Sequence, residues 1–131
     1  MKPTEAAALL TIAAAYDNRK SDADQAKAWA MALDGLRFED CREVIVQHYR
    51  RSREWLMPVD VIGGVRRLRD KRIDDHGPFE LPADLDPDDT GAYVRAVEDA
   101  KRRIGDGETL APPRAIGRRD VSNLGQIGRS A

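Results

Sequence analysis

A break in composition at residues 74–91 constrains most strongly how this chain of 131 residues can fold. The stretch holds seven acidic residues and three prolines, and it has neither lysine nor arginine. Such a composition is typical of a linker, because proline removes backbone donors and like charges repel one another. We therefore expect a folded N-terminal domain over residues 3–73 and a linker over residues 74–86, followed by a separate C-terminal part.

Four segments ahead of the break repeat their apolar residues at helical spacing. They cover about residues 4–17, 22–35, 38–53 and 58–73. In the second segment the inner face would consist of Ala26, Trp29, Ala30 and Leu33. Alanine supplies much of the apolar content, so the core must be thin. The fold class that we predict is all-α, with a compact N-terminal bundle of four helices.

Local signals at the segment ends also fit helices. Asp22 followed by Gln25 resembles a capping box, and Pro58 suits the first turn of a new helix. Gly63 and Gly64 are unfavourable inside that helix, at up to ~1 kcal/mol each relative to alanine. They indicate either close contact with a neighbouring helix or a late, frayed start, and the sequence leaves both open.

After the break, Asp86-Pro87 resembles a helix cap followed by a first-turn proline. This pattern predicts a fifth helix over residues 87–105. Its apolar stripe is narrow and consists of Tyr93, Val97, Ala100 and Ile104. Residues 106–131 are rich in glycine, proline and serine, and we expect this tail to be disordered.

Apolar residues outside the expected core are candidates for binding a protein partner. These candidates are Trp55, Val97, Ile104, Leu110, Ile116, Leu124 and Ile127. Trp29, on the inner face of the second segment, is instead assigned to the core. Two alternatives stay open for the fifth helix. It docks on the N-terminal domain through Tyr93 and Val97, or it folds onto a partner, because a lone helix of this length is marginal in water.

Charge is segregated along the chain although the net charge is only −1. Residues 42–73 hold nine basic and four acidic residues, a net +5, directly before the acidic break. The candidates for nucleic-acid contact are Arg50, Arg51, Arg53, Arg66, Arg67, Arg69, Lys71 and Arg72. Arginine suits phosphate because its planar guanidinium forms two parallel hydrogen bonds. The alternative is a solvated helix face that the acidic linker partly neutralises.

Enzyme chemistry is poorly represented in the sequence. One cysteine and two histidines are too few for a closed zinc site, and no glycine-rich phosphate-binding loop is present. Cys41 and His48 lie two helical turns apart, about 10 Å, which is a poor distance for a nucleophile and its base. We expect no enzymatic activity and no cofactor. A single cysteine and the lack of a long apolar run favour a cytoplasmic protein without a membrane span.

Four stretches carry a resemblance to a known family: "AAAYDNR", "AKAWAMALDGL", "FEDCREVIVQHY" and "LMPVDVIGGVRR". Their order, from Thr4 to Arg72, resembles the small phage helicase loader-inhibitor family and related replication proteins of actinobacterial phages. The resemblance implies an N-terminal helical domain followed by a flexible C-terminal region. It also implies binding to the hexameric replicative helicase of the phage or its host, to deliver the helicase to an origin complex while restraining its activity.

The function that we expect is therefore that of a phage DNA-replication accessory protein, an adaptor that binds and loads or restrains a hexameric replicative helicase. DNA or an origin-binding protein is a possible further partner. The alternative is a small helical DNA-binding or regulatory protein that uses the basic residues between Arg50 and Arg72. A third class is an enzyme subunit or a structural scaffold.

Overall fold

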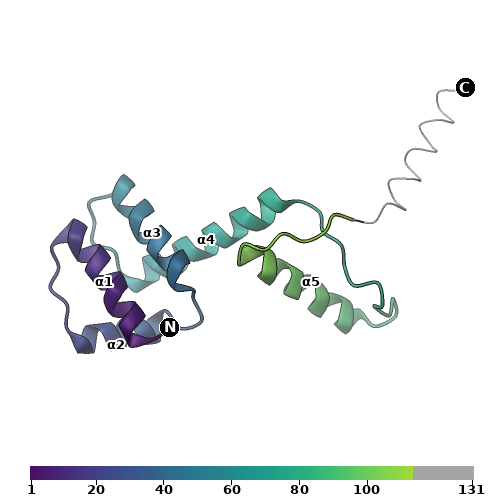
Figure 1. The fold of residues 1–131 in the computed structure, drawn as a ribbon, viewed down its shortest axis with the longest axis horizontal. Helices are drawn as coiled ribbons and strands as arrows, with labels where there is room; N and C mark the ends of the chain where they lie inside the picture. The colour runs from purple at the N-terminus through teal and green to yellow at the C-terminus, as the bar shows by residue number, and fades with distance from the viewer. Residues whose placement is uncertain (114–131) are drawn as a thin grey trace, which may run out of the picture. The chain divides into compact units, whose positions relative to one another are not determined.

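The computed structural model describes residues 1–113, and over these residues every regular element is an α-helix. The helices are α1 (Pro3–Asp17), α2 (Ala23–Ala32), α3 (Phe38–Arg51), α4 (Pro58–His76) and α5 (Thr90–Gly105) (Figure 1). The predicted all-α class is confirmed. The chain divides into two compact units, Met1–Arg69 and Asp70–Ala131, with the boundary inside α4. We call them the first and the second unit.

The core of the first unit forms where α1 packs against both α2 and α3. Its largest fully buried side chains include Leu9, Leu10, Leu33, Ile45, Leu56, Val61 and Val65. Alanines fill the remaining positions of this core at Ala6, Ala13, Ala26 and Ala30. Because small side chains let helix axes approach closely, a core with few aromatic residues still excludes water. Trp29 lies in this core, as the sequence predicted.

Helix α4 approaches α3 closely at Gly64. A Cβ atom built on Gly64 would overlap the side chain of Val44, and Val44 Cγ2 would lie only 3.1 Å away. A Cβ on Gly63 would meet only Arg67 Nη1, at 3.4 Å. Because α4 already begins at Pro58 and Gly64 lies against Val44, Gly64 marks a close helix contact and not a late start of the helix. The compact four-helix bundle stays a prediction.

Helix α3 ends at Arg51, two residues earlier than the sequence pattern predicted, because the backbone of Ser52 is extended. The Ser52 hydroxyl accepts a hydrogen bond from the backbone amide of Glu54 at 3.0 Å. Such a local side-chain bond competes with continuation of the helix. At its other end, α4 continues to His76, three residues beyond the expected limit at residue 73.

Helix α5 begins at Thr90 and not at residue 87, so the predicted start is wrong. The true N-cap is Asp89, whose side chain accepts a hydrogen bond from the amide of Ala92 at 3.0 Å. Asp86 instead accepts from the amide of Asp88 at 2.9 Å, which forms a turn that contains Pro87. Both aspartates suit a cap, and only the turn geometry decides between them.

The second unit holds the last turns of α4 together with α5 and the segments on either side of it. The guanidinium of Arg72 donates to the carbonyl oxygen of Gly105 at 2.7 Å, and the amide of Leu110 donates to His76 Nε2 at 2.9 Å. The amide of Glu80 donates to the carbonyl oxygen of Ala111 at 2.8 Å. Residues 74–76 thus belong to α4, and the segment that follows is held beside residues 110–111.

Candidate interaction surfaces

A buried polar cluster joins the end of α1 to the end of α3. The guanidinium of Arg19 pairs with Asp17, with Nη2 2.6 Å from Oδ2, and donates to the carbonyl oxygen of Leu56 at 2.8 Å. The hydroxyl of Tyr49 donates to Asp17 and accepts from the amide of Leu56 at 3.1 Å. Arg19 is only 5% exposed. Nearly every polar group of the cluster has a partner, which a buried ion pair requires.

The same contacts determine the charge states of the cluster. Burial alone would raise the pKa of Asp17, but hydrogen bonds from Arg19 and Tyr49 outweigh it and lower that pKa. Burial alone would lower the pKa of Arg19, and the bond to Asp17 outweighs it and raises the pKa. Burial and the bond to Asp17 raise the pKa of Tyr49. At neutral pH the cluster therefore holds a charged pair and a neutral phenol.

The cluster fixes the backbone between α3 and α4, residues 52–57, which we call the connector. Besides the two bonds to Leu56, the carbonyl oxygen of Glu54 accepts from His48 Nε2 at 2.6 Å. The amide of Met57 donates to Asp60 Oδ2 at 2.8 Å. An irregular segment with this many satisfied backbone groups has little freedom to rearrange. The connector is therefore a rigid platform.

Trp55 stands exposed on the connector. Its side chain is 56% exposed, although the residue that follows it is fully buried. The Cζ atom of Arg19 lies 5.0 Å from the ring centroid of Trp55 and 5.3 Å from that of Trp29. Both distances fall within the range of cation–π contacts. One exposed indole is thus held by a guanidinium that is itself fixed by Asp17.

The structure places the predicted basic residues in two classes. Five are exposed and form no ion pair within residues 1–113: Arg50, Arg51, Arg53, Arg66 and Arg67. Three have partners within the chain. Arg69 Nη1 lies 3.8 Å from Oδ2 of the buried Asp40, Lys71 lies 2.5 Å from Asp75, and Arg72 bonds to the carbonyl of Gly105. The sequence did not reveal the partner of Arg69. Asp40 lies in the first turn of α3, where an exposed acidic residue that pairs with nothing would be equally favourable.

The predicted protein-binding residues also differ in exposure. Ile104 is 2% exposed, so its side chain contributes to packing, whereas Val97 and Leu110 are half-buried. The remaining three, Ile116, Leu124 and Ile127, lie outside the described residues, as does most of the predicted disordered tail. Two large side chains of α5, Tyr93 and Val94, are exposed.

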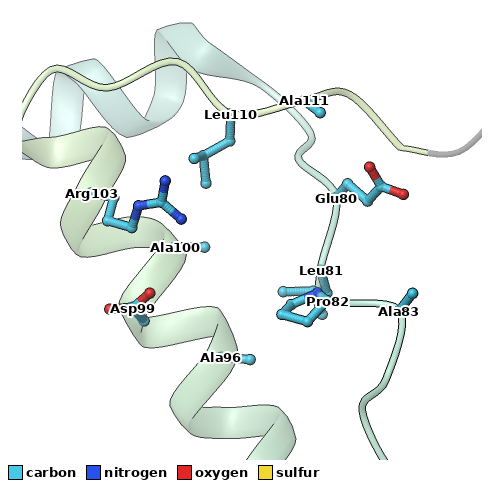
Figure 2. A pocket seen from close by; sticks show the side chains of 10 residues that line it. All are labelled: Glu80, Leu81, Pro82, Ala83, Ala96, Asp99, Ala100, Arg103, Leu110 and Ala111. Atoms are coloured by element: carbon cyan, nitrogen blue, oxygen red, sulfur yellow. The ribbon is translucent and has the colours of Figure 1, made fainter.

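A hollow of about 360 Å³ opens in the second unit beside α5. Its lining is Glu80, Leu81, Pro82, Ala83, Ala96, Asp99, Ala100, Arg103, Leu110 and Ala111. Figure 2 shows Leu110 pointing into the space between α5 and the segment that carries Leu81 and Pro82. Arg103 at the rim is paired with Glu108 at 2.8 Å. The hollow combines an apolar lining with charged edges, which suits an apolar side chain of a partner.

Other features limit the chemistry of the described part of the chain. Burial, with a smaller contribution from Asp40, raises the pKa of Cys41 to about 11, so its thiol is protonated and inert at neutral pH. Within residues 1–113, no three His, Cys, Asp or Glu side chains are placed to hold a metal ion together. None of the helices in the same range combines the length and apolar character that crossing a bilayer requires.

No protein-family model, curated protein or solved structure matches this chain. The likeness to helicase loaders therefore stays an interpretation of the four sequence stretches between Thr4 and Arg72.

Proposed function

We propose that this protein is a phage DNA-replication accessory protein that binds a hexameric replicative helicase and loads or restrains it. It acts as an adaptor, with no reaction of its own. The identity of the partner rests on the sequence resemblance between Thr4 and Arg72. The observation that supports an adaptor most directly is the hollow of about 360 Å³ beside α5, because apolar side chains from three segments line it together with a few charged ones.

The hollow has the properties of a site for a short partner segment. Ala96 and Ala100 on α5 leave room beside the helix, and Leu110 supplies an apolar wall. The charged side chains at the edges already have partners, since Asp99 pairs with Arg102 at 2.5 Å and Arg103 with Glu108 at 2.8 Å, so an apolar residue of the segment would make the main contact. Burying one large apolar side chain contributes about 1.5–3 kcal/mol to binding, so the hollow would supply one contact within a larger interface.

Truncation tests this assignment. The full chain is compared with chains ending at Ile73 and at Gly105 for co-elution with the purified hexameric helicase of an actinobacterial host. The first truncation removes the whole hollow, and the second removes Leu110 and Ala111 from its lining. We expect loss of binding in the first case and an intermediate loss in the second. Full binding by the chain ending at Ile73 would move the contact to the first unit.

A second function, contact with duplex DNA, is favoured by Arg66 and Arg67. Both are exposed on α4, and neither forms an ion pair within residues 1–113. Replacing both by alanine would flatten the salt dependence of duplex binding. Arg69 is unsuitable for this test, because its removal would deprive the buried Asp40 of its ion-pair partner. A wild-type protein without affinity for duplex DNA at low salt would exclude this function.

A further inference from the structure

We infer that the connector is a binding site for single-stranded nucleic acid, in which a base stacks on Trp55 and neighbouring arginines hold the phosphates. This inference concerns the first unit and does not rest on helicase binding. It follows from three observations, which are the rigidity of the connector, the exposure of the indole and the charge beside it.

The first observation is that the indole is held in place before any ligand arrives. The carbonyl and the amide of Leu56 are both bonded, to Arg19 at 2.8 Å and to Tyr49 at 3.1 Å. The guanidinium of Arg19 lies under the ring at 5.0 Å. A side chain that is already fixed loses little conformational entropy on binding, so the stacking energy is retained as affinity.

The second observation is that this ordered side chain leaves more than half of its surface in water. Trp55 is 56% exposed, whereas Trp29, the other tryptophan of the chain, is buried. A base offers a flat π-surface of matching size, and stacking tolerates any sequence because every base has such a face. The cation beneath the ring adds to the platform, since Arg19 keeps its charge through Asp17.

The third observation is the charge along the same short stretch of chain. Arg50, Arg51 and Arg53 are exposed, and no ion pair within residues 1–113 neutralises Arg50 or Arg53. Glu54 is the only acid between Arg50 and Met57. Arg53 is two residues from Trp55, so their Cα atoms lie within about 7 Å of each other. Arg53 is therefore near enough in the chain to reach the phosphate of a base that stacks on Trp55.

A protein partner would explain the exposed indole, but it explains the arginines less well. Arginine is enriched in protein interfaces, but each arginine that is unpaired in the free protein would need a matching acid on the partner when it is buried there. A polyanion with π-faces satisfies both features of the connector at once. Duplex DNA does not, because its bases are stacked inside the helix and offer no face to Trp55.

The test uses the full chain and a fluorescein-labelled oligonucleotide of twenty thymidines, with anisotropy measured from low to moderate salt. Trp55→Ala is expected to bind roughly 5- to 150-fold more weakly than the wild type, and Trp55→Phe to fall between them. The double variant Arg50→Ala/Arg53→Ala is expected to lower the slope of log K against log salt by about 1.4, at ~0.7 per lost phosphate contact. Arg42→Ala is the matched control, because Arg42 is an exposed arginine of α3 that is paired with Glu39.

Acrylamide quenching supplies a second readout. If Trp55 had only a structural role, added oligonucleotide would not change the quenching of its fluorescence. Trp29 is buried, so the accessible emission comes from Trp55, and bound oligonucleotide is expected to shield it. The inference is overturned if the wild type does not bind the oligonucleotide at low salt. It is also overturned if Trp55→Ala binds as well as the wild type, if shielding is absent, or if Trp55→Ala lowers affinity only for the helicase.

Discussion

The guanidinium of Arg19 donates a hydrogen bond to the carbonyl oxygen of Leu56, a residue 37 positions further along the chain. This bond joins the end of α1 to the connector. The same guanidinium pairs with Asp17 and lies against two indole rings. A loop residue just after α1 thus determines the conformation of the surface that exposes Trp55.

A double-mutant cycle measures how strongly Asp17 and Arg19 are coupled. Arg19→Met leaves the Asp17 carboxylate buried without its cation, and we expect it to lower the free energy of unfolding by about 3–5 kcal/mol. Asp17→Asn combined with Arg19→Met removes both charges, and the double variant should lose less than Arg19→Met alone. Urea unfolding followed by circular dichroism gives the values. Strict additivity of the two single changes would contradict the coupling.

The lowered pKa of Asp17 predicts a dependence of stability on pH. Because the pKa in the folded protein is below its ordinary value of 3.8, this carboxylate stabilises the fold at neutral pH. That contribution is present above about pH 4 and is lost as the pH falls through the folded pKa. The stability difference between the wild type and Asp17→Asn should therefore shrink from pH 7 to pH 3. A difference that is constant over this range would contradict the prediction.

Adjacent glycines in α4 offer a matched pair of substitutions. Gly64→Ala places a methyl group against Val44, and overpacking of this kind lowers stability by about 1–3 kcal/mol. Gly63→Ala meets no such obstacle, and we expect it to be neutral or to stabilise by up to ~1 kcal/mol through helix propensity. Thermal unfolding of the two variants distinguishes them. Equal stability of the Gly63→Ala and Gly64→Ala variants would contradict a close contact between α3 and α4 at Gly64.

Val44→Ala in the Gly64→Ala background supplies the complementary test. Removing the two methyl groups of Val44 makes room for the new Cβ atom. The second change should therefore restore part of the lost stability, although Val44→Ala alone removes core packing.

Helix positions were largely predictable from the sequence, because the 3.6-residue spacing of apolar side chains depends only on local order. The start of α5 was not, since Asp86 and Asp89 are chemically equivalent caps and only the Asp86–Asp88 turn distinguishes them. The role of Gly64 depends on how close Val44, on another helix, comes to it. That distance is set by tertiary packing and cannot be derived from the local sequence.

The candidate sites were less predictable than the helices. No role was assigned to Asp17 or Arg19 from the sequence, because no local pattern indicates that Tyr49 and Leu56 come to meet them. Leu110 was identified as a binding residue because it lacked a place in a helix stripe. The hollow that it lines is formed by segments on both sides of α5, so its existence depends on tertiary structure.

Affinity for a purified hexameric replicative helicase tests the central claim most directly. Leu110→Glu places a charge in the hollow, whereas Val94→Glu places the same charge on an exposed part of α5 that does not line it. Circular dichroism first establishes that both full-length variants keep their helices. The account predicts helicase binding by the wild type and by Val94→Glu, and a loss of at least about tenfold for Leu110→Glu. A wild type that does not bind the helicase, or a Leu110→Glu variant that binds it as tightly as Val94→Glu does, would contradict it.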